Sequence, residues 1–201
     1  MKEYSKMRWI IWNEIRRYLA IPYIRLKFLM SGIHWGNNWR VFGSPIIQKY
    51  KGSKIRIGDE LVMRSWISSN PVAPNHPVFL STRSLGAEIL IGNEFGITGG
   101  SIIAQKRVII GDRVIVGGNC LIADTDFHPL DKAVRKESPN LTFGMPITIG
   151  DDVFIGTNSI ILKGTQIGGG SIIGAGSIVS GVIPANVVAA GNPAVVIRNI
   201  E

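Results

Sequence analysis

One histidine lies among several carboxylates in the second half of the chain. The stretch Asp124-Thr-Asp-Phe-His-Pro-Leu-Asp131 places His128 close to Asp124, Asp126 and Asp131. An imidazole exchanges a proton near neutral pH, and a hydrogen bond to one ring nitrogen can orient it for that task. The same residues also suit an ordinary surface loop. The residue types alone therefore leave both a proton-transfer site and a solvated loop open.

The chain around this cluster repeats with a period of six. From Ile149 onward a β-branched aliphatic residue recurs at every sixth position, usually followed by glycine. These positions are Ile149, Ile155, Ile161, Ile167, Ile173 and Val179. Neither an α-helix nor an alternating strand has this period, whereas a hexapeptide β-helix does. Each hexad thus predicts a short strand with its aliphatic residue inward, and the coils must stack to bury that residue.

The repeat extends upstream with interruptions. Ile91, Ile97 and Ile103 keep the spacing of six, and a stretch rich in proline and serine between 67 and 85 is expected to be irregular. A second interruption, 127–146, leaves the coil and contains the histidine. Long loops in compact repeats are usually functional or disordered, and the composition of this loop favours function.

These residues resemble the hexapeptide-repeat acyltransferases, which include galactoside, maltose and xenobiotic acetyltransferases. The resemblance covers roughly residues 55–200 and is carried by the hexads, the His-Pro loop and the closing segment Ala189-Ala-Gly-Asn-Pro-Ala-Val-Val-Ile-Arg198. It implies an all-β solenoid, a left-handed parallel β-helix, here with a short N-terminal amphipathic helical segment. It also implies acetyl transfer from acetyl-CoA to a hydroxyl or an amine, in homotrimers whose sites lie between neighbouring β-helices.

The catalytic histidine of that family corresponds to His128. Its task would be that of a general base, which takes the acceptor's proton during attack on the thioester carbonyl. A partner should orient the ring, and Asp126 is the first candidate, ahead of Asp124 and Asp131. Asp126 falls on a normally inward hexad position, where a carboxylate must be paired or out of register.

The resemblance also implies acceptor contacts. Galactoside-type enzymes carry an asparagine where this chain has Thr98, which is a departure from the galactoside-type acceptor set. An aromatic residue that lines those sites corresponds to Phe154. His76, in an Asn-His-Pro sequence, is either a further acceptor contact or structural.

Coenzyme contacts are expected in the last coils. Backbone amides around Gly156, Ala175 and Gly176 would contact the pantetheine of acetyl-CoA. A Thr-Lys pair that often follows Gly-Ser-Ile-Val in the family is absent here, which leaves Lys163 and Arg198 as the candidates for phosphate charge.

Metal and thiol chemistry are not expected. A related enzyme, the gamma-class carbonic anhydrase, uses three histidines, but this chain has three in all and His34 precedes the readable coils. Zinc enzymes need three converging protein ligands, so no metal site is predicted. The single cysteine, Cys120, excludes an internal disulfide, and its inward hexad position predicts a small buried hydrophobe.

Positive charge is concentrated at the start of the chain. The formal net charge is +8, but residues 1–56 hold twelve basic and two acidic residues, and the remainder is slightly acidic. A nucleic-acid binder would spread basic charge along a face, so no nucleic-acid partner is expected. We expect a basic helical segment and cap over 1–54, then a β-helix acyltransferase domain over 55–201 with the inserted loop 127–146.

The N-terminal segment predicts an amphipathic helix that Pro22 ends or kinks. Its apolar face consists of Ile11, Trp12, Ile15, Tyr18 and Leu19. This face either packs onto the β-helix end or a neighbouring subunit, or lies in an anionic membrane interface. No transmembrane helix or signal peptide is expected, so the predicted location is the cytoplasm, with peripheral contact at the inner face of the membrane as an option.

The leading functional hypothesis is an acyl-CoA-dependent O-acetyltransferase. Its acceptor would be a hydroxyl of a sugar or polysaccharide precursor, because this version of the His-Pro loop resembles enzymes of surface-polysaccharide modification. An N-acetyltransferase of an amino sugar is the second hypothesis. The non-enzymatic alternative is a β-helix scaffold that binds a membrane or a partner through its N-terminal helix.

Overall fold

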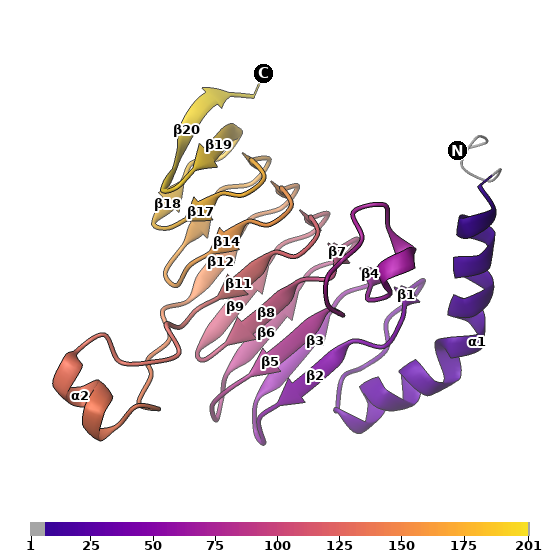
Figure 1. Ribbon diagram of the computed structural model, residues 1–201, viewed down its shortest axis with the longest axis horizontal. Helices are drawn as coiled ribbons and strands as arrows, with labels where there is room; N and C mark the ends of the chain where they lie inside the picture. Colours follow the sequence, from indigo (N-terminus) through magenta and orange to yellow (C-terminus); the bar gives the residue numbers. More distant parts are fainter. Residues whose placement is uncertain (1–6, 201) are drawn as a thin grey trace.

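The computed structural model describes residues 7–200 and shows a three-sided solenoid with a long helix beside its first coils (Figure 1). Successive strands pass from a first sheet to a second and then to a third. Strands within each sheet are parallel, apart from the last pair, β19 with β20. One coil is thus three short strands and three turns, as the period of six predicts.

The elements of residues 7–200 are as follows. The first sheet contains β1 (Arg40–Phe42), β4 (Val62–Arg64), β7 (Gly96–Thr98), β10 (Ile115–Val116), β13 (Phe154–Ile155), β16 (Ile172–Ile173), β19 (Val187–Gly191) and β20 (Ala194–Asn199). The second contains β2 (Ile46–Lys49), β5 (Phe79–Thr82), β8 (Ser101–Ala104), β11 (Leu121–Ala123), β14 (Ile160–Ile161) and β17 (Ile178–Val179). The third contains β3 (Lys54–Ile57), β6 (Glu88–Ile91), β9 (Arg107–Ile110), β12 (Ile147–Ile149), β15 (Gln166–Ile167) and β18 (Val182–Ile183). The helices are α1 (Arg8–Met30) and α2 (Lys132–Glu137), and a short 3-10 helix spans Ile67–Ser69.

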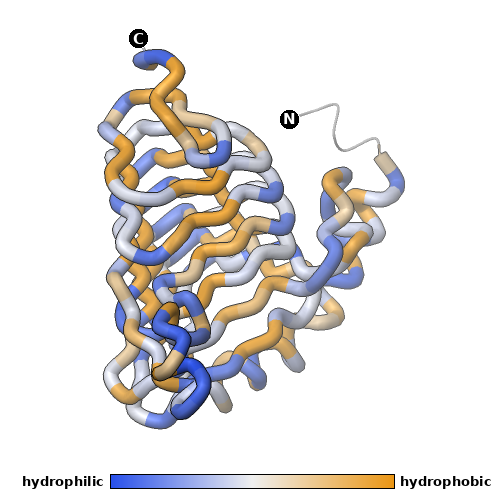
Figure 2. Tube along the Cα trace, turned by 60° about the vertical axis from the view of Figure 1, so that its left-hand side comes forward, coloured by the Kyte–Doolittle hydropathy of each residue, from blue (hydrophilic) through white to orange (hydrophobic). Residues whose placement is uncertain are grey.

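Inward aliphatic residues of the stacked coils form the core. In the third sheet, buried isoleucines pair in register from coil to coil: Ile57, Ile91, Ile110, Ile149, Ile167 and Ile183. Figure 2 shows the corresponding hydrophobic segments recurring along the solenoid. Buried hydroxyls are paired with turn carbonyls, as where Ser159 Oγ donates to the Gly156 oxygen at 2.8 Å. Cys120 is buried in this core, as predicted.

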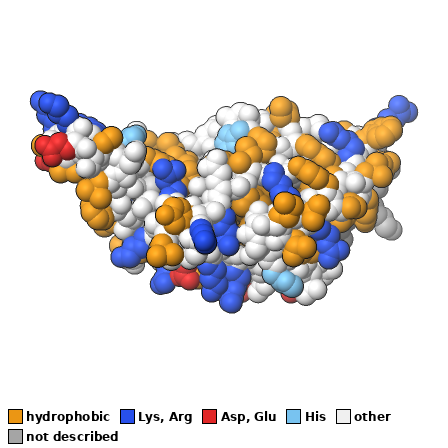
Figure 3. All heavy atoms as spheres, turned by 90° about the horizontal axis from the view of Figure 1, so that it is seen from below, with side chains coloured by type: hydrophobic (Ala, Val, Ile, Leu, Met, Phe, Trp, Pro, Cys, Tyr) orange, Lys and Arg blue, Asp and Glu red, His pale blue; other side chains and the backbone are white. Residues whose placement is uncertain are grey.

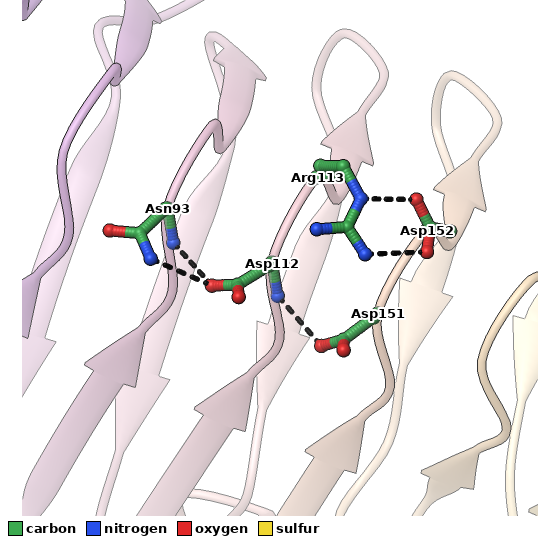
Figure 4. Close-up of polar contacts among 5 residues, drawn as sticks. All are labelled: Asn93, Asp112, Arg113, Asp151 and Asp152. Carbon is green, nitrogen blue, oxygen red and sulfur yellow. Dashed lines mark hydrogen bonds and ion pairs between the residues drawn. The ribbon is translucent and has the colours of Figure 1, made fainter.

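Polar side chains join the coils at the turns from the third sheet to the first (Figure 4). The carboxylate of Asp112 accepts the backbone N–H of Asn93 at 2.6 Å, and that of Asp151 accepts the backbone N–H of Asp112 at 2.9 Å. On the same edge Arg113 binds both carboxylate oxygens of Asp152, at 2.6 and 2.8 Å. Asp112 and Asp151 thus each satisfy a turn N–H of the preceding coil, and the Arg113–Asp152 ion pair adds a side-chain link between coils.

The coils begin earlier than the sequence pattern indicated. β1, β2 and β3 form a first coil from Arg40 to Ile57, so the β-helix starts ahead of residue 55. Within the stretch 67–85, expected to be irregular, residues 79–82 form β5. The pattern fails here because the early coils use strands of three or four residues and longer turns, whereas the last coils use strands of two residues.

The inward residue of β8 also differs by one position from the predicted frame. Ile102, rather than Ile103, pairs with Ile122 and has no exposed surface. It comes five residues after Ile97 because a tight Gly99-Gly100 turn separates β7 from β8. The spacing of six is therefore broken at this turn.

α1 continues through Pro22 and is bent, as a proline inside a helix causes (Figure 1). Its C-terminal half buries Ile24 and Phe28 against the first coil, and Phe28 packs edge-on against Trp35 and Trp39. This half of the helix is the cap expected at the solenoid end. Neither helix in residues 7–200 combines the length and apolarity of a membrane span.

The N-terminal half of α1 is held by polar contacts instead. Asn13 is buried and its Nδ2 donates to the Ser68 carbonyl at 2.6 Å. The predicted apolar face points away from the solenoid, because Trp12 and Leu19 keep 64% and 78% of their surface exposed. The expectation that this face packs onto the chain's own β-helix is wrong, since the contact with the 3-10 helix uses the polar side.

Candidate active site

His128 lies in an arm, residues 124–146, that leaves the solenoid between β11 and β12 (Figure 1). The arm projects from the corner between the second and third sheets and is largely hydrophilic (Figure 2). Phe127 has a φ of 65°, a left-handed conformation uncommon for such a residue, and turns the chain just before the histidine. Asp131 then caps α2 by accepting the Val134 N–H at 2.9 Å.

The backbone of the arm orients the His128 ring. Nδ1 of His128 lies 2.8 Å from the carbonyl oxygen of Pro139. A carbonyl oxygen can only accept, so Nδ1 carries the proton and donates it. The neutral ring therefore has an unprotonated Nε2, which is the tautomer that a general base requires.

A pocket of about 280 Å³ opens beside His128. The arm contributes apolar side chains to its wall, including Leu141 and Phe143. Asp126, at the base of the arm, and Lys163, in the turn between β14 and β15, complete the wall. The arrangement places a proton acceptor at the edge of a partly apolar cavity that could hold part of a small molecule.

Asp126 does not orient His128, which corrects the expectation from sequence. Its carboxylate forms an ion pair with Lys163, with side-chain exposures of 31% and 27%. Across residues 7–200 no hydrogen bond joins it to the histidine. The turn at Phe127 takes this part of the chain out of the coil, so the inward register is lost. The orienting group is the Pro139 carbonyl, and Lys163, expected at the coenzyme phosphates, pairs with the carboxylate.

Asp124, the other carboxylate nearby, is buried at the root of the arm. Its two carboxylate oxygens accept the backbone N–H groups of Gln105, Lys106 and Arg107 at 2.6, 2.7 and 2.7 Å. Burial raises the pKa of Asp124, although these hydrogen bonds act in the opposite direction. The sequence did not predict this anchoring role; the position of Asp124 directly before the loop was the available signal.

The predicted acceptor residues lie elsewhere. Thr98 ends β7 on the first sheet, and its Oγ1 accepts from Asn70 Nδ2 at 3.2 Å. The His76 backbone lies close to Gly99, the residue after Thr98. A Cβ on Gly99 would lie 2.7 Å from the His76 carbonyl oxygen. Phe154, on β13 of the same sheet, is partly exposed. The structure thus brings Thr98 and the His76 backbone together, apart from the His128 pocket.

Three of the predicted coenzyme residues, Gly156, Ala175 and Gly176, lie at the edge between the first and second sheets. Gly156 and Ala175 stack in consecutive turns, where a Cβ on Gly156 would lie 2.5 Å from the Ala175 nitrogen. Gly176 N donates to the Thr157 carbonyl at 2.8 Å. Arg198 lies on β20, the last strand of the first sheet. Only glycine fits at 156, because the coils approach backbone to backbone there.

Within one chain, the predicted site residues therefore lie in two separate parts of the solenoid. His128, Asp126 and Lys163 occupy the corner between the second and third sheets. The other predicted residues lie on the first sheet or where it meets the second. His128, the predicted base, and most of the predicted contacts do not meet within a single chain.

Known proteins share this repeat. Residues 146–180 match the family described as the hexapeptide repeat of succinyl-transferase. This segment of the chain therefore carries the hexapeptide repeat. A putative acetyltransferase of Saccharomyces cerevisiae is 45% identical over 116 residues, which cover 57% of this chain and 58% of that protein. Galactoside O-acetyltransferase of Escherichia coli is 43% identical over 126 residues, covering 62% and 59%. The chain thus spans about three fifths of the length of these curated relatives.

The fold is also shared with a solved structure. A galactoside acetyltransferase in complex with coenzyme A superposes with a TM-score of 0.56 and 27% identity, covering 98% of this chain and 84% of that protein. Together with the three parallel sheets, this similarity confirms the predicted fold class, a left-handed parallel β-helix with an N-terminal helix. The resemblance to the hexapeptide-repeat acyltransferases is confirmed as well.

Proposed function

We propose that this chain transfers an acetyl group from acetyl-CoA to a hydroxyl of a sugar or polysaccharide precursor, with His128 as general base. The observation that carries the proposal is the hydrogen bond from His128 Nδ1 to the Pro139 carbonyl, which leaves Nε2 free at a pocket. Relatives named acetyltransferases and a coenzyme A complex of the same fold support the donor. The galactoside O-acetyltransferase supports a sugar hydroxyl as acceptor.

The chemistry follows from the ring's tautomer. Nε2 of His128 takes the acceptor's proton as the oxygen attacks the thioester carbonyl, and a tetrahedral intermediate forms. Its collapse breaks the carbon–sulfur bond, and the imidazolium returns the proton to the leaving thiolate. The Pro139 carbonyl, which accepts from Nδ1–H, stabilises the imidazolium in between. A general base of this kind contributes roughly 10²- to 10⁴-fold in rate.

A homotrimer would complete the site. His128 lies at one corner of the coil, whereas the edge formed by Gly156 and Ala175 lies at another. A three-fold assembly of β-helices can set the first corner of one subunit against the second corner of its neighbour. Each site would then combine the base of one chain with the coenzyme edge of the next. Sedimentation velocity should report three chains, and a stable monomer with full activity would exclude this arrangement.

A peripheral membrane role is favoured by one further observation, the exposed apolar face of α1. Tyr18, Leu19 and Tyr23 are each more than 60% exposed, and basic residues such as Arg16 and Lys27 flank the face. Figure 3 shows hydrophobic side chains with Lys and Arg among them over the end of the molecule where α1 lies. A basic amphipathic helix with exposed aromatic residues suits an anionic lipid surface, which would place the protein at the cytoplasmic face of a membrane.

The enzymatic proposal is tested by matched acceptors. Purified protein is incubated with acetyl-CoA and either a sugar or its amino counterpart, and free thiol from coenzyme A is measured. Release with the hydroxyl acceptor supports O-acetylation, whereas release with the amino sugar alone supports the N-acetyltransferase. No release with either, together with no binding of coenzyme A by calorimetry, would favour the scaffold.

A further inference from the structure

A second cavity, of about 260 Å³, lies between α1 and the first two coils. Its described lining includes Trp9 and Asn13 of α1, Arg40 of β1, Arg64 of β4 and Asn70 in the turn that follows. It shares no described residue with the lining of the His128 pocket. Within one chain the cavity is thus separate from the His128 pocket.

Positive charge exceeds negative charge around this cavity. The guanidinium groups of Arg64, Arg40 and Arg17 lie 4.4, 5.6 and 5.7 Å from the centroid of the Phe42 ring. Glu14 is the one acidic side chain among the described residues of the lining. Its carboxylate is shared between Arg17, at 2.7 Å, and Arg40. Three cations thus lie around the Phe42 ring, and the one carboxylate pairs with only two of them, Arg17 and Arg40.

Arg64 is the least compensated of the three. It donates to the Ser69 carbonyl, and no carboxylate within residues 7–200 forms an ion pair with it. Burial and the positive charge of Arg40 lower the pKa of Arg64, which means that its surroundings disfavour the charged form. A half-buried guanidinium without a carboxylate partner is a costly arrangement that a bound anion would relieve.

We infer that this cavity binds the anionic group, carboxylate or phosphate, of a small molecule through Arg40 and Arg64. Arginine pairs with both groups through parallel N–H donors, which gives affinity and orientation together. The side-chain amides of Asn13 and Asn70 each donate one N–H within the protein, to Ser68 and Thr98, and each has a second N–H that can serve as a neutral donor. Trp9 supplies an apolar wall for the uncharged part of the ligand. A sugar acid and a sugar phosphate both have this composition. The site does not depend on acetyl transfer.

Substitutions of Glu14 and of Arg40 should change the affinity for an anion in opposite directions. Its carboxylate occupies Arg17 and Arg40 and so competes with any added anion. Glu14→Gln removes that competitor and should tighten anion binding severalfold. Arg40→Met, at a half-exposed position, removes one guanidinium group. It should weaken anion binding by roughly tenfold or more, the expected loss for one charge-assisted hydrogen bond.

The experiment is a calorimetric titration of the whole protein at constant ionic strength. The probes are inorganic phosphate, glucuronate and glucose 1-phosphate, with chloride as the reference salt. Saturable binding is expected, weakened in Arg40→Met and Arg64→Met and strengthened in Glu14→Gln. Arg113→Met is the matched control, because Arg113 pairs with Asp152 on another edge, and it should bind as the wild type does.

The probes also distinguish the two sources of charge. Glucuronate bound more tightly than glucose 1-phosphate indicates a carboxylate ligand, and the reverse order indicates a phosphate. Arg64 is half-buried, so circular dichroism must show that Arg64→Met folds. If Arg64→Met is unfolded, the binding affinity of Arg40→Met alone decides the result. Absence of saturable binding, or an affinity unchanged in Arg40→Met, overturns the inference.

Discussion

Nδ1 of His128 donates to the carbonyl oxygen of Pro139 at 2.8 Å, and the two residues are eleven positions apart in the same arm. The proposed base is therefore oriented by the fold of the arm rather than by a carboxylate on the solenoid. Arg135 of α2 holds the segment that follows the histidine, because its Nη1 donates to the carbonyls of Pro129 and Leu130 at 2.8 and 2.9 Å. Arg135 is thus a positioning residue.

We predict that Arg135→Met lowers kcat by roughly tenfold, since a misplaced general base loses part of its 10²- to 10⁴-fold contribution. KM for acetyl-CoA should stay the same, because Arg135 lies in the arm and not at the coenzyme edge. Steady-state kinetics at several pH values measure both parameters. Lys132→Met is the matched control on the same helix. If both variants behave like the wild type, the arm does not orient the histidine through Arg135.

Asp124→Ala should destabilise the fold by roughly 3 kcal/mol, because three backbone N–H groups lose a buried acceptor. Denaturant unfolding followed by circular dichroism measures the change. Asp131→Ala serves as the comparison, since Asp131 only caps an exposed helix and its loss should cost about 1 kcal/mol. Equal effects of the two substitutions would show that Asp124 is not an anchor of the arm.

Acid stability should depend on Glu14. Burial raises the pKa of Glu14, but hydrogen bonds and charges from Arg40 and Arg17 outweigh it, so the pKa lies below its usual 4.5. Such a carboxyl stabilises the fold above its unfolded pKa, and that stabilisation is lost as pH falls through the folded pKa. Glu14→Gln should therefore unfold at a lower temperature at pH 7 and lose less stability below pH 4.5. If the unfolding temperatures of Glu14→Gln and the wild type change with pH in the same way, Glu14 does not stabilise the fold through its carboxylate.

The exposed face of α1 should bind anionic vesicles. A Trp12→Ser, Leu19→Ser double variant removes two side chains that are 64% and 78% exposed, so it should lose vesicle binding in a sedimentation assay and keep acetyl transfer to a soluble acceptor. Leu85→Ser, as exposed as Leu19 but on the solenoid, should change neither. If the double variant instead dissociates the oligomer, the face packs against a neighbouring subunit.

Local spacing accounts for what could be predicted from the sequence. The hexads from Ile149 onward predicted strands, register and inward residues correctly, because each contact repeats one coil later along the chain. The arm was also expected, since its residues break that spacing. At β1 the longer strands and turns hide the period, so the first coil was missed.

Contacts between distant residues could not be predicted in the same way. Asn13 packs its polar side chain against Ser68, 55 positions away, and no pattern within α1 indicates which face does so. The partner of His128 is a backbone carbonyl, which any residue could provide, so residue types pointed to Asp126 instead. The pairing of Asp126 with Lys163 depends on two turns that meet only in the folded coil.

The central claim is that the His128 imidazole, oriented by the arm, is the base of an acetyl transfer. The most direct measurement is coenzyme A release with a sugar acceptor by wild type, His128→Ala and Asp126→Asn, each checked for folding. The rate of His128→Ala should fall by a factor of at least about 10² relative to the wild type. The rate of Asp126→Asn should stay within about fivefold of the wild-type rate, because a partly exposed ion pair contributes little. Wild-type turnover by His128→Ala would contradict the account.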